Sequence, residues 1–301
     1  MGYAALVRKK KYKDFLFYVL GILSLFAILM ILLLLMVDLA RTGSERLDFN
    51  FLSSFPSRFA SKAGILPALV GSLCVMIVTA LVAIPIGIAS GVYLEEYAPK
   101  SFFSSFIELN IINLAGIPSI IFGLMSLGIF VHQLQWGPSI ATGGITLGLL
   151  VLPIVIVSTR EAIRTIPKTM REASFALGSS RWQTIWNHIL PYSSGGIMTG
   201  VIIALSRAIG ETAPLLTIGA VAYIAYLPPS PLTHELPFIN FQWMKESFTA
   251  MPIQMFNWVS RPQDEFHVNA AAAGIILLAM TLSMNMVAII IRYRFRKKMK
   301  W

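Results

Sequence analysis

The chain has 301 residues, of which 56% are hydrophobic and 13% are charged, and its formal net charge is +10. Soluble domains carry about 25% charged residues, and a soluble core of this size would still need a wettable surface. The composition therefore excludes an ordinary soluble domain and indicates an integral membrane protein. Basic runs near the two ends flank long apolar segments, which favours anchoring in the lipid bilayer over binding of nucleic acid.

Six apolar segments predict the membrane-spanning helices. The first, residues 15–37, carries no charge and is long enough to cross ~30 Å of hydrocarbon at ~1.5 Å per residue. It is too long for the apolar region of a cleavable signal peptide. The other spans are expected at residues 68–94, 109–131, 140–159, 194–222 and 269–291. The predicted fold class is all-α, a polytopic membrane helical bundle with six transmembrane helices.

The distribution of basic residues orients this bundle. If both termini are cytoplasmic, the inner segments are 1–14, 95–108, 160–193 and 292–301. These segments hold 17 of the 24 Lys and Arg residues, and the outer segments hold six. Because Lys and Arg gather on the cytoplasmic side of membrane proteins, we expect a multi-pass protein of the cell (inner or plasma) membrane with both termini in the cytoplasm.

Glycine and proline inside the spans indicate helices that are closely packed and locally interrupted. Glycines recur at a spacing that lets helix backbones approach closely, at Gly87 and Gly91, Gly144 and Gly148, and Gly196 and Gly200. Prolines fall within four spans, at Pro85, Pro118, Pro153 and Pro214. The backbone groups that proline leaves free must be satisfied by neighbouring helices or by a water-lined cavity, which suits a transporter better than an anchor.

The cytoplasmic loop at residues 160–191 is predicted to form two short amphipathic helices, 168–177 and 181–190, because Pro167 and Gly178 interrupt it. On the first helix, one face is expected to hold Met170, Ala173 and Leu177. The second has an apolar stripe at helical spacing, formed by Trp182, Ile185, Trp186 and Ile189. Such a stripe packs either on the membrane surface or on another protein.

A charged pair lies within the fifth predicted span. Arg207 lies about 20 Å along that span at ~1.5 Å per residue, near or past the bilayer centre, where an arginine costs ~2.5–3.5 kcal/mol on insertion scales. It must therefore face the bundle interior or water. Glu211 can meet it one helical turn later, so the pair either fixes helix packing or provides fixed charge on an ion path. A guanidinium suits an oxyanion because its planar donors fork onto two oxygens.

The residues of the cytoplasmic loop resemble a known signature, the EAA loop of ABC-importer permeases, E-A-A-x3-G-x9-I-x-L-P. The matching positions are Glu172, Ala173, Ser174, Gly178, Leu190 and Pro191. Ser174 stands in place of the third small residue of the motif, and His188 stands in place of an isoleucine. In that family the first short helix fits a groove in the cytoplasmic ATPase and transmits its closure. The resemblance implies this coupling role for the six matching residues, and a glycine suits the tight break between two helices.

Three further stretches resemble the phosphate-importer permeases, and two of them are closer to the PstA-type subunit than to its PstC-type partner. They are residues 115–124 (AGIPSIIFGL), 207–216 (RAIGETAPLL) and 248–261 (FTAMPIQMFNWVSR). The resemblance implies a type I ABC-importer permease (MetI-like) fold and the import of inorganic phosphate, with Arg207, Glu211 and Thr212 on the substrate path. It also implies three partners: a PstC-type permease, a PstB-type cytoplasmic ATPase dimer and an external phosphate-binding protein.

We expect the chain to divide into an N-terminal part (1–67) with the first span and an outer loop, a permease core (68–292) with the coupling loop, and a basic cytoplasmic tail (293–301). The outer loop at 223–268 is predicted to begin without helix, because it contains Pro228, Pro229, Pro231 and Pro237. Its Phe248 and Trp258 suggest a segment at the membrane surface, and contact with an external binding protein is the alternative.

The sequence offers no nucleotide-binding motif, since it contains no Gly-Lys pair and so no P-loop. With one cysteine, Cys74, and four widely separated histidines, a metal cluster is not expected. We expect no bound cofactor in this chain, with ATP and magnesium held by the partner ATPase. The alternatives are the same architecture importing sulfate or molybdate, which an arginine fork does not distinguish from phosphate, and a gradient-driven transporter, although no inverted repeat is evident.

Overall fold

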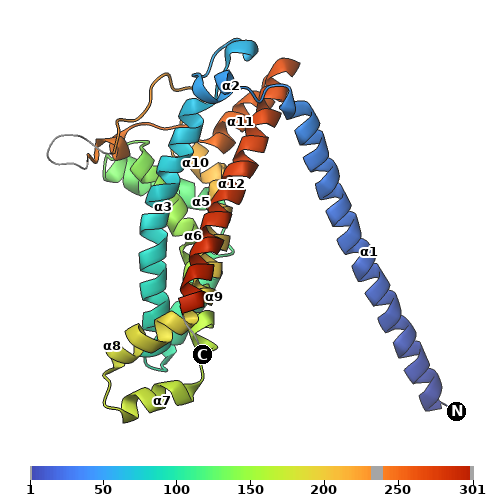
Figure 1. Cartoon of the computed structure of the whole chain (residues 1–301), viewed down its shortest axis with the longest axis vertical. Coiled ribbons are helices and arrows are strands. Elements are labelled where there is room, and N and C mark those ends of the chain that lie inside the picture. Colours follow the sequence, from blue (N-terminus) through green and yellow to red (C-terminus); the bar gives the residue numbers. More distant parts are fainter. Residues whose placement is uncertain (1, 232–239, 299–301) are drawn as a thin grey trace.

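The computed structural model describes residues 2–231 and 240–298, and its regular elements are helices (Figure 1). The α-helices are α1 (Gly2–Ser44), α2 (Phe49–Ser53), α3 (Leu66–Val92), α4 (Phe102–Leu114), α5 (Ser119–Ser126), α6 (Ile140–Arg164), α7 (Lys168–Ala176), α8 (Arg181–Thr184), α9 (Leu190–Ile209), α10 (Ala213–Thr217), α11 (Met251–Val259) and α12 (Asp264–Lys298). There are also π-helical turns: η2 (Tyr93–Tyr97) extends α3, η3 (Leu127–Gln133) extends α5, and η4 (Ile185–Ile189) joins α8 to α9. Two 3-10 turns, η1 (Ala60–Lys62) and η5 (Gln242–Lys245), lie in loops. The predicted all-α fold is confirmed.

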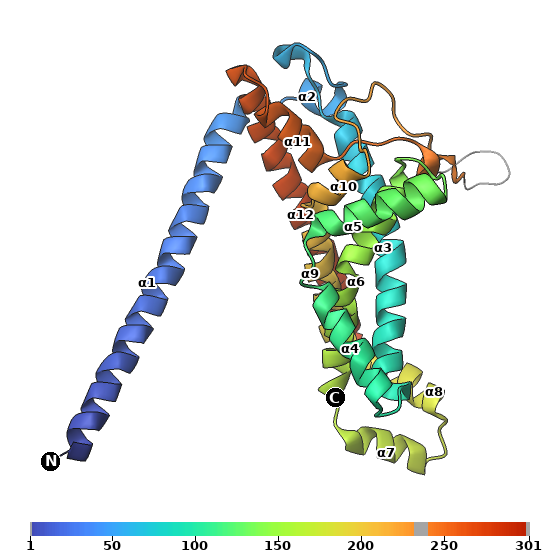
Figure 2. The same cartoon turned by 180° about the vertical axis from the view of Figure 1, so that it is seen from behind.

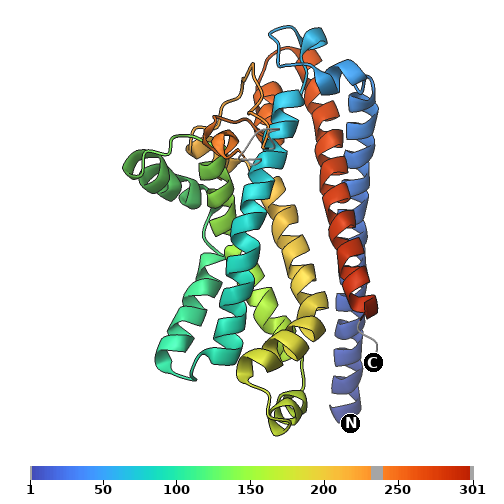
Figure 3. The ribbon, with the colours of Figure 1, turned by 60° about the vertical axis from the view of Figure 1, so that its left-hand side comes forward.

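Among the described residues, five helices are long and apolar enough to cross a membrane, and the count is six if one sharply bent helix pair forms a single span. The predicted number of spans therefore requires that the bent pair be counted as one. Both ends of the described chain lie at the end of the bundle that carries α7, opposite the end that carries α2 (Figures 1 and 3). We call these the α7 end and the α2 end. The predicted basic tail at 293–301 begins within α12, and residues 299–301 lie outside the described residues.

The span predicted at residues 109–131 is not one continuous helix. The chain turns by 103° between α4 and α5–η3, at a break that contains Gly116 and Pro118. Proline disfavours helical dihedral angles in the residue before it, and its own ψ of 134° takes the chain out of the helix. The proline that was predicted to sit inside a span therefore ends α4 and starts α5.

The predicted span at residues 194–222 is also wrong at both ends. Helix runs without a gap from Arg181 to Ile209, so the second short helix of the loop is the first part of this span rather than a separate element. Pro191 lies within this continuous helix, where the π turn η4 passes into α9, and its missing N–H leaves a backbone carbonyl of the preceding turn without its helical donor. After Ile209 the chain breaks at Gly210, and only the short α10 follows before the loop.

The core of the bundle lies between α3, α6 and α9, and the glycine pairs allow its close packing. A Cβ at Gly87 of α3 would lie 2.6 Å from Val155 of α6, and one at Gly91 would lie 2.7 Å from Thr159. Gly144 and Gly148 of α6 face Val78 and Val82 of α3 in the same way, and Gly196 and Gly200 of α9 face Ala162 and Ser158 of α6. The prediction that these pairs mark helix contacts is confirmed.

A leucine at Gly87 is expected to destabilise the bundle, because overpacking a tight contact costs about 1–3 kcal/mol. The measurement is thermal unfolding of the purified protein in detergent. Gly21→Leu is the matched control, since nothing lies within 4 Å of a Cβ at Gly21 in α1. Equal melting temperatures for Gly87→Leu and Gly21→Leu would contradict the close packing of α3 on α6.

Helix α1 stands apart from the bundle along most of its length and meets it at the α2 end (Figures 1 and 2). There, a Cβ at Gly43 would lie 2.7 Å from the backbone of Ala271 in α12. The large apolar side chains of residues 15–37 are exposed on this chain. Such a helix is stable where lipid or another apolar surface surrounds it.

Candidate coupling loop and substrate path

Helix α7 protrudes from the α7 end of the bundle and carries the first half of the motif-like sequence (Figure 1). It starts after Pro167 and ends at Ala176, and Gly178, two residues later, has a φ of +84°, which lies in the left-handed region. The N–H of Gly178 donates to the carbonyl of Phe175 at 2.9 Å, and that of Ser179 donates to the carbonyl of Ser174 at 3.2 Å. A left-handed residue of this kind closes a helix and satisfies its last carbonyls. The predicted break at Gly178 is confirmed, and its geometry explains why the residue is glycine.

The side of α7 that contacts the rest of the chain differs from the predicted one. Ser174 is buried, and its hydroxyl lies 2.9 Å from that of Thr184 in α8. Met170 packs against a buried apolar cluster formed by α3, α6 and η4. Ala173 is exposed, and the side chain of Leu177 is 88% exposed. The face predicted to hold Met170, Ala173 and Leu177 is therefore not the one that contacts α8, because that contact falls on Ser174.

The opposite side of α7 is exposed and partly apolar. It presents Ala173, Ala176 and Leu177, and the exposed side chains of Glu172 and Phe175 lie at its edge, beside a hollow toward η2. Exposed apolar residues on so short a helix, outside the apolar length of the bundle, mark a surface that another protein can cover. The structure thus places Glu172 and Ala173 on a free surface, Ser174 in a helix contact and Gly178 at the turn.

The predicted stripe on residues 181–190 splits into two sides. Ile185 and Ile189 are fully buried in the apolar cluster with Ile163 and Val92. Trp182 and Trp186 are exposed and stack on each other, with ring centroids 5.6 Å apart. Leu190 packs against the same cluster, and Pro191 is half-buried at the start of α9. The last two motif positions therefore lie where the loop enters the bundle.

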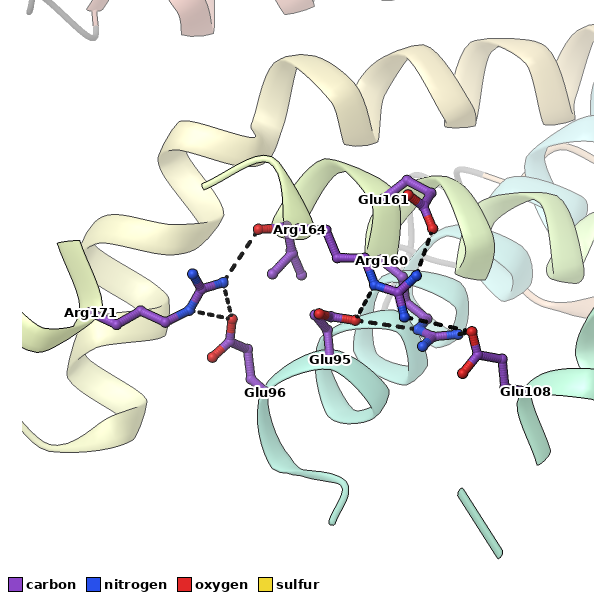
Figure 4. A network of polar contacts seen from close by, with 8 residues as sticks. Glu95, Glu96, Glu108, Arg160, Glu161, Arg164 and Arg171 are labelled. Carbon is purple, nitrogen blue, oxygen red and sulfur yellow. Dashed lines mark hydrogen bonds and ion pairs between the residues drawn. The ribbon is translucent and has the colours of Figure 1, made fainter. Parts of the chain in front are cut away.

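Sequence analysis missed an ion network beside α7 (Figure 4). Arg160 Nη1 lies 2.8 Å from Glu108 Oε1 of α4, and Arg164 Nε lies 2.9 Å from Glu95 Oε2 of η2. Arg164 Nη1 also lies 3.0 Å from Glu161 Oε1 on α6. The sequence contains a signal for this network. Glu95 and Glu96 follow one predicted span, and Arg160 and Arg164, one helical turn apart, follow another. A count of Lys and Arg residues alone did not reveal it.

A further ion pair joins α7 itself to η2. Arg171 Nη2 lies 2.7 Å from Glu96 Oε1, and both side chains are largely shielded from solvent, at 18% and 10% exposure. Figure 4 shows Glu95 and Glu96 on one turn, with Glu95 directed to α6 and Glu96 directed to α7. The ends of α3, α4, α6 and α7 are therefore held together by charged side chains.

The predicted substrate-path residues lie at the break after α9. Arg207 Nε lies 3.3 Å from Glu211 Oε1, so the predicted pair forms. The Arg207 side chain is 41% exposed and that of Glu211 is 18% exposed, so Arg207 is not enclosed by the helices of this chain. Thr212 precedes the first residue of α10 and is half-buried. A cation in the last turn of a helix is favoured by the helix dipole.

The two interrupted spans meet near this pair. Helix α10 packs against α5, and a Cβ at Gly123 of α5 would lie 2.7 Å from Cα of Pro214. In transporters, interrupted membrane helices leave backbone groups and helix ends available to ions and substrates. The arrangement therefore combines one fixed arginine, one carboxylate and two helix breaks.

The outer segment differs from its prediction. Phe248 and Trp258 are buried, and α11 packs on α12 and α3, so these side chains pack within the protein and do not face lipid. Trp258 belongs to a cluster with Phe51 and Met251 at the α2 end. The proline-rich start is non-helical at Pro228, Pro229 and Pro231 as predicted, and Pro237 lies outside the described residues.

Comparison with known sequences places the chain among transport proteins. A family model described as "Binding-protein-dependent transport system inner membrane component" matches residues 83–301. The chain is 38% identical over 174 residues to the probable ABC transporter permease protein YqgI of Bacillus subtilis, a match that spans 58% of this chain and 59% of that protein. It is 31% identical to the probable phosphate transport system permease protein PstA of Methanocaldococcus jannaschii, over 98% of this chain and 97% of that protein.

Solved structures show the same fold. A chain of the MetNI methionine ABC transporter in an inward-facing conformation matches with a TM-score of 0.60 and 15% identity, over 77% of this chain and 95% of that one. A chain of a bacterial alginate ABC transporter, in complex with an alginate-bound periplasmic protein, matches with a TM-score of 0.64 and 15% identity, over 93% and 94%. The predicted MetI-like permease fold is confirmed. With the family model matched from residue 83 to the end, this chain belongs to the family of binding-protein-dependent transport system inner membrane components.

Proposed function

We propose that this chain is the permease subunit of an ATP-driven ABC importer that carries inorganic phosphate into the cell. The observation that carries this proposal is α7, a short helix whose inner side is fixed to the spans and whose outer side is free and partly apolar. When a separate protein binds the free side of such a helix and displaces it, the movement is transmitted to the bundle through the fixed side. The chain would thus need no nucleotide site of its own.

Phosphate as the substrate is supported by the names of the relatives and by the charge in the path. A relative aligned over nearly the whole chain is named as a phosphate transport system permease. Arg207 offers a guanidinium that stays ionised and can fork onto two oxygens of an oxyanion. Glu211 would temper this charge so that the anion is released after it is bound.

The partners we propose are a PstC-type second permease, a PstB-type ATPase dimer that binds ATP and magnesium, and an external phosphate-binding protein. The exposed side of Arg207 supports a second permease, because a charge within the membrane needs a polar or protein surface around it. The exposed side of α7 supports the ATPase. In this arrangement the α7 end and both termini face the cytoplasm, and residues 68–292 form the permease core.

Uptake by the complete complex tests the substrate. The complex of this chain with its co-purifying subunits and the binding protein is reconstituted into vesicles loaded with ATP, and labelled phosphate, sulfate and molybdate are offered separately. We expect ATP-dependent accumulation of phosphate alone. Accumulation of sulfate or molybdate would establish another oxyanion as the substrate, and transport by this chain without any ATPase would establish a gradient-driven transporter.

A further inference from the structure

The guanidinium of Arg171 connects α7 to two other elements. Its Nε and Nη2 donate to Glu96 Oε1 at 3.0 and 2.7 Å. Its Nη1 donates to the carbonyl of Ile166 at 2.9 Å, and Nη2 donates also to the carbonyl of Ile163, in the last turn of α6, at 3.3 Å. All three nitrogens of one side chain are thus engaged at the ends of α6 and α3.

The covalent connections of α7 do not lead to α3. Residues 165–167 join α7 to α6, and residues 177–180 join it to α8 and α9. The Ser174–Thr184 hydrogen bond strengthens the second of these connections. A displacement of α7 can therefore reach α3 only through non-covalent contacts.

Besides the packing of α6 on α3, two kinds of direct contact join α7 to the end of α3. Met170 packs on the apolar cluster below α7, but methionine is flexible and adapts to a shifted neighbour. The Arg171–Glu96 pair is charge-assisted and fixes direction as well as distance. A hollow of about 560 Å³ lies beside the pair, lined on one side by Lys100 and on the other by Glu172 and Phe175. Because this space separates α7 from the turn after α3, the two elements are joined there by the Arg171–Glu96 ion pair and not by a broad packed interface.

Glu95, which precedes Glu96 in η2, extends this link to other helices. Glu95 lies 2.9 Å from Arg164 and 3.6 Å from Arg160, both on α6. Arg160 in turn lies 2.8 Å from Glu108 on α4. The two carboxylates of η2 therefore point to different partners (Figure 4), and the turn itself is π-helical, a conformation that is frequent at functional sites.

We propose that the Arg171–Glu96 pair is the link through which movement of α7 is passed directly to α3 and, through Glu95 and Arg160, to α4. This inference rests on the proposed function, in which a partner ATPase moves α7. Arg171 and Glu96 are positioning residues, since their role is to hold α7 against the spans. Removing either one leaves the exposed side of α7, where the ATPase is expected to bind, unchanged.

The coupling ratio of the reconstituted complex tests the link. For Glu96→Gln and Arg171→Gln, we expect full co-purification of the ATPase but about tenfold more ATP hydrolysed per phosphate imported, the scale of one lost charge-assisted hydrogen bond. The double variant is expected to be no worse than Arg171→Gln alone, because that variant already removes the pair together with the hydrogen bonds to the carbonyls of Ile163 and Ile166. A residue that only stabilised the fold would lower the yield without changing this ratio.

Glu161→Gln is the matched control. Glu161 sits on α6 in the same network, is 61% exposed and pairs with Arg164 on its own helix, so we expect a wild-type ratio for this variant. An unchanged ratio in Glu96→Gln and Arg171→Gln would overturn the inference, and so would loss of ATPase binding in both, because the pair would then serve docking. A wild-type complex that imports no phosphate would instead overturn the proposed function, before any variant is compared.

Discussion

Phosphate uptake by the complete complex is expected to fall to background when Gly178 is replaced by valine. The φ of +84° at this position costs an L-residue about 1–2 kcal/mol, and a β-branched side chain fits it especially poorly. Nothing lies within 4 Å of a Cβ at Gly178, so the effect would come from backbone conformation and not from a clash. Relaxation of the turn would release the carbonyls of Ser174 and Phe175 and change the direction of α7. The measurements are ATP-driven uptake of labelled phosphate and co-purification of the ATPase.

Two matched variants separate this cause from others. Asparagine adopts the left-handed conformation more readily than other non-glycine residues, so Gly178→Asn should retain most of the uptake. Gly195→Val adds the same side chain at a position in α9 with open space around it and no positive φ, and it should be close to wild type. The explanation fails if Gly178→Val transports normally, or if asparagine at 178 is as harmful as valine.

Local sequence rules were sufficient for the helical class, the glycine contacts and the turn at Gly178. The reason is that each depends on a short pattern: apolar length for a span, four-residue glycine spacing for a close contact, and a glycine after an amphipathic segment for a helix end. The prediction of one continuous span through Pro118 failed because proline can have either of two effects in a membrane helix. It can be tolerated inside a span when neighbours satisfy the backbone, or it can end one helix and start another. Composition does not decide between them, and the packing of α10 on α5 does.

Tertiary pairing explains the remaining failures. Which side of α7 is buried depends on Thr184 in α8, which accommodates Ser174, and no periodicity within α7 contains that information. Phe248 and Trp258 were assigned to a membrane surface because tryptophan favours such interfaces, but Trp258 packs within the protein, against Phe51 of α2. The ion network was missed for the same reason, since Glu96 and Arg171 lie far apart in the sequence and meet only after α3 and α6 have packed.

Replacing Arg207 with glutamine is expected to lower phosphate uptake about 10- to 100-fold, because a hydrogen bond to a charged group contributes ~1.5–3 kcal/mol. The variant should still insert and accumulate in the membrane. Among the described residues, the ion-pair partner of this exposed guanidinium is the carboxylate of Glu211, at 3.3 Å and on the next helical turn. The measurements are uptake of labelled phosphate and the amount of assembled complex in the membrane.

Exchanging the charges of Arg207 and Glu211 tests whether the pair binds the anion or only stabilises the end of α9. In the variant with Arg207→Glu and Glu211→Arg, the ion pair one helical turn apart can form again, so a purely structural pair would regain both accumulation and uptake. An anion path would not recover, because the cation would move from the last turn of α9 to the residue two positions before α10 and would leave a carboxylate where the phosphate passes. We expect normal accumulation with uptake still reduced about 10-fold or more, in line with the lost contact. Full recovery of uptake would show that Arg207 holds α9 in place and does not contact the anion.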